Sequence, residues 1–204
     1  MKTKIERFTL GLILAPVTPL AGLMAFWWLS YALLPEKWIA VGTVAGLLLG
    51  LLADVFLLKR LIDRAHTVKM LFWAAVFLFY AVGLFGFFMG VPVFHAALAV
   101  PAGFVVGARL ARAAAGPAQV RTAARRTALF TTLVLAFICT ASATIALLSP
   151  STAADLQGML GLGFAVTPAM IWGLILVGGA GLLAVNWALT GLSVRLTQRF
   201  LGIP

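Results

Sequence analysis

The chain has 204 residues, of which 63% are apolar and only 10% are charged. A soluble globular domain is usually about 45–50% apolar and about 25% charged, so this composition excludes water-soluble enzymes and indicates an integral membrane protein. The net charge of +10 comes from basic residues in short loops between apolar runs, a pattern that orients membrane helices and does not indicate nucleic-acid binding.

Six apolar runs follow one another along the chain, and a helical crossing of the bilayer needs about 20 such residues. No run alternates apolar and polar residues as a barrel strand does. We therefore predict an all-α polytopic membrane protein, with a single transmembrane domain over residues 1–204. Its expected spans cover about residues 8–34, 38–58, 70–89, 92–111, 128–148 and 168–190.

The basic residues fall almost entirely on one side of this arrangement. Of the 15 Lys and Arg residues, only Lys37 lies in a loop of the opposite side. Since loops rich in Lys and Arg stay in the cytoplasm, we expect three helical hairpins in the plasma or inner membrane, with both termini cytoplasmic.

Two segments depart from simple spans. Pro16 and Pro19 interrupt the first span, because proline lacks the N–H donor and clashes with the carbonyl four residues earlier. An ordinary kink and a broken helix facing protein or water are both open. In the longest loop, 149–167, Thr152 and Asp155 have the spacing of a capping box. This predicts a short surface helix and leaves open whether the loop is a lid.

The second span has a small-residue face that ends in a carboxylate. Gly42, Gly46, Gly50 and Asp54 recur every fourth residue, and glycines in that register let another helix approach closely. We assign the glycines to helix packing and expect Asp54 to be a buried charge. It is either a functional group or a structural one that snorkels to the interface or pairs with a basic residue (Lys59, Arg60 or Arg109).

The fourth span repeats this pattern, with His95, Ala99, Gly103 and Gly107 on one face. The small residues are again assigned to helix packing. His95 is interpreted either as a hydrogen-bonded histidine in a packed interface or as a ligand-binding or proton-sensing group.

Other spans also place polar residues on inward faces. Tyr80 lies in the third span, Asn186 in the sixth, and Thr132 shares a small-residue face with Cys139 in the fifth. Packing alone explains each of them, but such a distribution suits a small polar solute held between helices. We therefore predict a solute site formed by His95, Tyr80 and Asn186.

Catalytic and metal-binding motifs are missing from the sequence. The two histidines, His66 and His95, are expected on opposite sides of hydrocarbon about 30 Å thick, so they cannot share a metal or a haem. Phosphate-binding loops and nucleophile motifs are absent as well. We predict no cofactor, no metal and no enzymatic activity. A lipid-processing enzyme that uses Asp54, Asp63 and His66 is a third alternative.

Short motifs in the first half of the chain carry a resemblance to a transporter family. They are Pro16-Val-Thr18, the glycine-rich stretch Gly46–Gly50, Tyr80–Gly86 followed by Gly90–Phe94, and Val100–Phe104. Over about residues 16–107 they resemble the substrate-binding S-components of energy-coupling-factor vitamin transporters, most nearly the biotin-specific ones. Pro19 and an extra basic loop before the third span depart from that pattern.

The resemblance implies uptake of a vitamin-like solute, with ATP hydrolysed by separate membrane-associated subunits. Binding or transport of a small solute is therefore the first functional hypothesis. The expected partners are the lipid bilayer, other membrane subunits and the solute itself. The alternative is an accessory subunit whose glycine faces dock other subunits.

Overall fold

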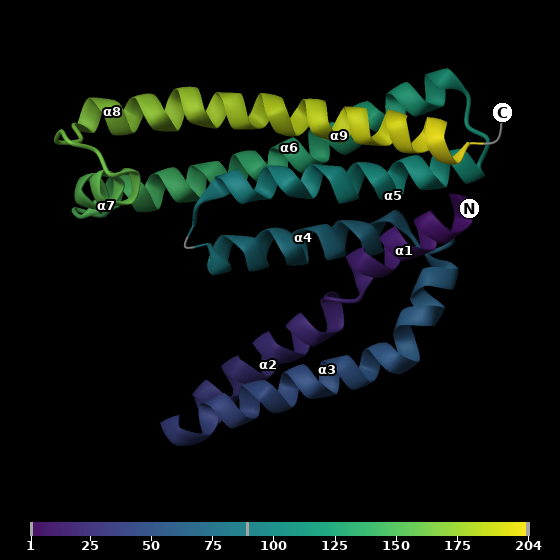
Figure 1. Ribbon diagram of the computed structural model, residues 1–204, viewed down its shortest axis with the longest axis horizontal. Helices are drawn as coiled ribbons and strands as arrows, with labels where there is room; N and C mark the ends of the chain where they lie inside the picture. Colours follow the sequence, from purple (N-terminus) through teal and green to yellow (C-terminus); the bar gives the residue numbers. More distant parts are fainter. Residues whose placement is uncertain (1, 89, 203–204) are drawn as a thin grey trace. The chain divides into compact units, whose positions relative to one another are not determined.

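A computed structural model describes residues 2–88 and 90–202 of the chain. Within these residues the structure consists of helices joined by loops, without strands (Figure 1). Six of the described helical segments are long and apolar enough to cross a membrane, which confirms the expected class and number. They are Lys4–Leu33, Glu36–Arg64, Met70–Phe87, Pro92–Arg112, Pro117–Leu148 and Pro168–Leu201.

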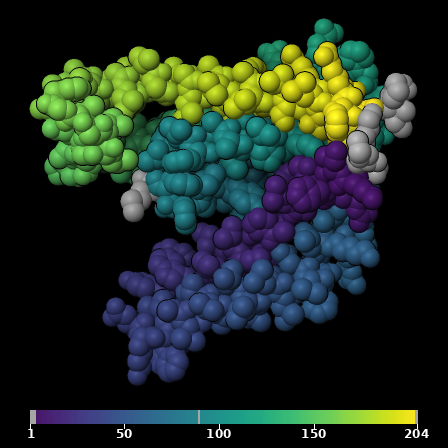
Figure 2. Space-filling view, in the orientation of Figure 1, coloured from purple at the N-terminus to yellow at the C-terminus, as the bar shows by residue number. Residues whose placement is uncertain are grey.

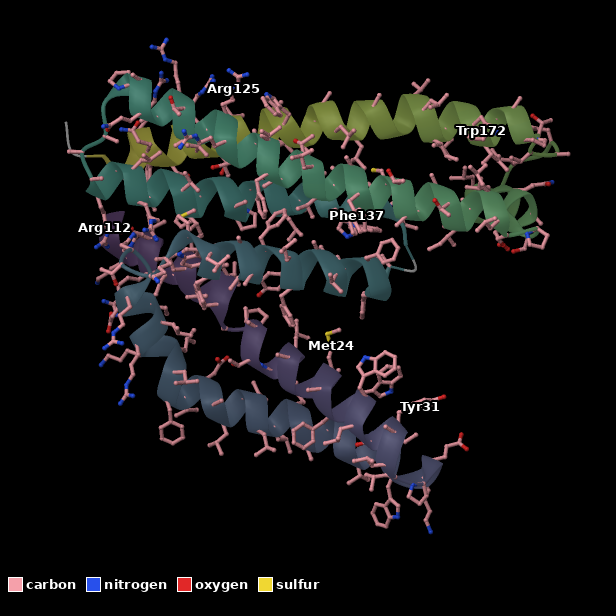
Figure 3. All side chains as sticks on the ribbon, turned by 180° about the vertical axis from the view of Figure 1, so that it is seen from behind. Met24, Tyr31, Arg112, Arg125, Phe137 and Trp172 are labelled. Carbon is pink, nitrogen blue, oxygen red and sulfur yellow. The ribbon has the colours of Figure 1, made fainter. Side chains whose placement is uncertain are left out.

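The helices also expose large apolar side chains. Val55 is 74% exposed, Phe137 74% and Val177 76%, and Phe137 projects from its helix in Figure 3. Soluble proteins rarely expose continuous apolar surface of this kind. Side chains that face hydrocarbon explain it, as expected of an integral membrane protein.

The first span is divided at its prolines. Helix α1 (Lys2–Leu14) ends just before Ala15 and Pro16, and α2 (Val17–Leu33) begins just after them. Since Pro16 and Pro19 have no N–H, the carbonyls of Leu12 and Ala15 lack their usual donor four residues later. The first span is therefore two helical segments with a backbone defect between them.

The chain forms two compact units that meet in sequence at residues 76 and 77. Unit 1 contains α1, α2, α3 (Glu36–Arg64) and the beginning of α4 (Met70–Phe87). Within it, α2 runs along α3 (Figures 1 and 2). The buried Trp73 indole donates a hydrogen bond to the Ala65 carbonyl at 3.1 Å, which ties the start of α4 to the end of α3.

Unit 2 contains the rest of α4 and the remaining helices. Helix α5 (Ala99–Arg112) packs against both α6 (Pro117–Leu148) and α9 (Gly179–Leu201), and its contact with α9 is visible in Figure 2. The segments α8, η2 and α9 together form the last span. The other helical segments of unit 2 are η1 (Pro92–Leu98), α7 (Thr152–Leu160), α8 (Pro168–Gly173) and η2 (Leu174–Gly178).

The helices extend beyond several of the expected apolar runs, as α3 does to Arg64 and α9 to Leu201. Helix α6 begins at Pro117, well before the expected residue 128, because the basic segment that precedes the apolar run continues the helix. The short helix expected in loop 149–167 is present as α7, but the capping role assigned to Thr152 is wrong. Ser151 is the N-cap and donates to Asp155 at 2.7 Å, whereas Thr152 donates to the Ala146 carbonyl.

Candidate functional site

His95 is buried in unit 2, with 3% of its surface exposed. Gly90 turns the chain with a φ of +83°, which favours glycine, and Pro92 then starts the short helix η1 that carries the histidine. The ring atom Nε2 lies 2.9 Å from the Ala81 carbonyl of α4. Because a carbonyl only accepts, Nε2 must carry a hydrogen and donate it.

The second ring nitrogen of His95 has no partner. Its Nδ1 is buried and makes no hydrogen bond within the described chain. In the neutral ring this atom is an acceptor, and in the charged ring it is a second donor. In either form, it has an unused hydrogen-bonding capacity inside the protein.

Tyr80 immediately precedes the residue that accepts from His95. It is half-buried, and its ring lies 5.8 Å from that of Phe79. Tyr80 is therefore the chain neighbour of the α4 residue whose carbonyl binds His95.

Asn186 belongs to a different hydrogen-bond network. Its side-chain amide donates to Thr131 at 3.2 Å and to Thr132 at 3.0 Å, which joins α9 to α6. The Thr131 and Thr190 hydroxyls lie 2.9 Å apart, and Thr190 donates to the Asn186 carbonyl. Since neither partner of the amide is His95, Asn186 acts in helix packing within this structure.

Thr131 was missed by the sequence analysis, which selected its neighbour Thr132. The signal lies in the spacing of buried positions along α6, where Ala124, Ala128, Thr131 and Leu135 recur at intervals of three and four. These intervals place residues on one helix face. Thr131 is therefore a member of the buried face.

Asp54 contacts the divided first span. It is half-buried on α3 and accepts a hydrogen bond from the Thr18 hydroxyl of α2. Among the described residues of unit 1, no basic side chain forms an ion pair with this carboxylate. The polar contact made by Asp54 is thus with an uncharged hydroxyl at the helix break.

The glycine face of α3 is occupied by α2. A Cβ placed on Gly46 would meet the Gly22 carbonyl oxygen and come within 2.7 Å of the Phe26 ring. One at Gly50 would lie 2.6 Å from the Pro19 Cα. Gly42 of α3 faces Ser30 of α2.

The small residues of α5 pack in the same way against α9. A Cβ on Gly103 would lie 2.8 Å from the Thr190 carbonyl oxygen, and one on Gly107 would lie 2.6 Å from that of Val194. Ala99, near the start of α5, is fully buried. Both small-residue faces are therefore covered by helices of the same chain.

Two of the three residues considered for lipid chemistry, Asp63 and His66, contact α1. Asp63 pairs with Arg7 at 2.9 Å, and His66 pairs with Glu6 at 3.0 Å. These contacts connect α1 to the end of α3 and to the turn that follows it. Asp63 and His66 each have a partner on α1, which provides no support for an acid–base pair formed between them.

Neither a cluster of metal ligands nor a surface groove identifies a further site among the described residues. Within residues 2–88 and 90–202, no three His, Cys, Asp or Glu side chains come together. A shallow groove of about 390 Å³ on unit 2 is lined by Phe104, Leu196, Thr197 and Phe200, none of them a predicted site residue. Comparisons with known protein families, with curated proteins and with solved structures found no match.

Proposed function

We propose that the chain is a membrane-embedded subunit that binds a small polar solute at His95 for transport. The observation that carries this proposal is the buried, unpartnered Nδ1 of that residue. Leaving a buried polar atom without a hydrogen bond costs roughly 1–3 kcal/mol, and native proteins rarely tolerate it without a functional reason. A bound solute supplies the missing partner.

The chemistry of Nδ1 restricts the solute. With Nε2 donating to Ala81, the neutral ring accepts at Nδ1 from a hydroxyl or an N–H group. The proposed solute is therefore a small molecule with such a donor, which includes vitamin-like compounds. Tyr80, next to Ala81 in the chain, is the second proposed contact. Asn186 supports the site through the packing of α9 and does not touch the solute.

The proposed topology has six crossings as three hairpins in the plasma or inner membrane, with cytoplasmic termini. The distribution of basic residues supports it, since Lys37 alone lies opposite the others. In Figure 3, Arg112 and Arg125 lie at one end of unit 2 and Trp172 lies at the other. In a Cys139→Ala background, a membrane-impermeant maleimide should label Lys37→Cys on intact cells and leave Arg125→Cys unlabelled.

Separate subunits are proposed to hydrolyse ATP, since the sequence contains no phosphate-binding loop. The resemblance of the short motifs in residues 16–107 to energy-coupling-factor S-components is the basis for this part of the proposal. The alternative role as a docking subunit is not favoured, because Gly46 and Gly103 already pack against helices of their own chain. Those faces offer no free surface to a partner.

Two substitutions of His95 separate solute binding from folding. His95→Gln places an amide nitrogen near the position of Nε2 and removes Nδ1, so the bond to Ala81 can persist. His95→Asn retains a polar atom near Nδ1 and loses the Ala81 contact. We expect native mass spectrometry of the gently solubilised wild-type protein to show a retained small molecule, and His95→Gln to fold without it.

His95→Asn should instead lower the melting temperature, because it breaks the link between η1 and α4. Thr140→Val serves as a control, since that exposed hydroxyl bonds only to its own helix. Retention of the same small molecule by His95→Gln would contradict the proposed site. Absence of any small molecule from the wild-type protein, with no metabolite raising its melting temperature, would contradict the function itself.

A further inference from the structure

Asp54 lies within the apolar run of α3, on the membrane side of the basic end of this helix. The exposed Arg7–Asp63 ion pair lies at that basic end, and Lys59 and Arg60 precede it on α3. With a rise of 1.5 Å per residue, Asp54 is about 13.5 Å along α3 from Asp63 and about 7.5 Å from Lys59. The carboxylate therefore lies about a turn and a half inside the apolar run.

The negative charge of this group is uncompensated within unit 1. Its hydrogen bond comes from the Thr18 hydroxyl, which is uncharged, and no described basic side chain of the unit pairs with it. A charge at membrane depth is costly and is normally neutralised by a partner. The group therefore calls for a cation or a proton from outside the chain.

The helix break, three to six residues before Thr18 in the chain, leaves further backbone oxygen atoms without a donor. Pro16 and Pro19 leave the carbonyls of Leu12 and Ala15 without their usual donors. Gly50, one turn before Asp54, allows close contact with the break, since a Cβ there would lie 2.6 Å from the Pro19 Cα. In membrane transporters, unwound backbone carbonyls of broken helices coordinate sodium ions.

We propose that Asp54 and Thr18 form a binding site for a monovalent metal cation of the sodium type at the break between α1 and α2. The available ligands are all oxygen atoms, which suits a hard cation. A single carboxylate balances one positive charge, which favours a monovalent ion over a divalent one. The site goes beyond the solute site proposed at His95 and lies in the other unit.

The test compares sodium with an inert cation in the absence of any solute. Purified full-length protein in zwitterionic nanodiscs is melted in NaCl and in choline chloride of equal ionic strength. Sodium should raise the melting temperature by roughly 5 °C or more at saturation, and ²²Na⁺ should bind in a scintillation proximity assay. Asp54→Asn should abolish both effects, and Thr18→Val should weaken them.

Asp63→Asn is the matched control, because it makes the same change on the same helix at an exposed position. It should respond to sodium as the wild type does. Equal melting temperatures in both salts with no ²²Na⁺ binding would overturn the proposal, as would a sodium response that survives in Asp54→Asn. If choline and sodium are equivalent while Asp54→Asn is more stable than the wild type, the carboxylate is a destabilising charge that binds no cation, and the cation site is refuted. Because no solute is involved, failure here is distinct from failure of the His95 site.

Discussion

Gly46→Ala tests the close packing of α2 on α3. A Cβ at this position would meet the Gly22 carbonyl oxygen and approach the Phe26 ring at 2.7 Å. The ring can change its rotamer, but a backbone oxygen in a helix cannot move unless the helix moves with it. We therefore expect α2 and α3 to separate at their closest point.

The magnitude follows from two opposing effects. Overpacking of a close contact costs typically 1–3 kcal/mol, and the backbone contact here places the expected cost at about 2–3 kcal/mol. Replacing Gly by Ala within a helix returns roughly 0.5–1 kcal/mol. The net loss in the free energy of unfolding should be about 1–2.5 kcal/mol.

Gly11→Ala is the matched variant in the same unit. A Cβ there would lie 3.4 Å from the Ile62 Cδ1 atom, which is an ordinary contact. It should gain the same helix preference without the clash, so the two variants should differ by about 2–3 kcal/mol. Unfolding in mixed detergent micelles, followed by circular dichroism, measures this difference. Equal stability of the two variants would refute the packing argument.

Three further substitutions probe other contacts by the same unfolding measurement. Asn186→Leu removes two donated hydrogen bonds from a buried network and should cost about 1–2 kcal/mol; an unchanged stability would show that the network is not energetically important. Glu6→Ala should cost several times more free energy of unfolding than Asp63→Ala, because the contact of Glu6 with His66 is nearly buried and the Asp63–Arg7 ion pair is exposed. Exposed ion pairs contribute about 0–1 kcal/mol, and equal losses would contradict this ranking. Trp73→Phe leaves the Ala65 carbonyl without its indole donor and should lower the free energy of unfolding by about 1–2 kcal/mol. An unfolding curve identical to that of the wild type would contradict this expectation.

Local pattern predicted the helices well, because the length and hydropathy of a span are properties of consecutive residues. It also placed Gly46 on a helix face that is now seen packed against Gly22. Partner choice could not be predicted in this way. The hydrogen bonds from Thr18 to Asp54 and from Asn186 to Thr131 join residues that are 36 and 55 positions apart, and many hydroxyls in this chain are equally compatible with the pattern.

The polar side chains within the spans differ in how completely the chain satisfies their hydrogen bonds and charge, and both proposed sites are based on this difference. Both amide hydrogens of Asn186 are used between α6 and α9. His95 instead keeps a buried nitrogen without a partner, and Asp54 keeps a charge that Thr18 alone does not neutralise. Hydrogen bonds within the chain give Asn186 a structural reason to be polar. Under the two proposals a ligand offsets the cost of burying the other two side chains, so binding measurements should begin with these two residues.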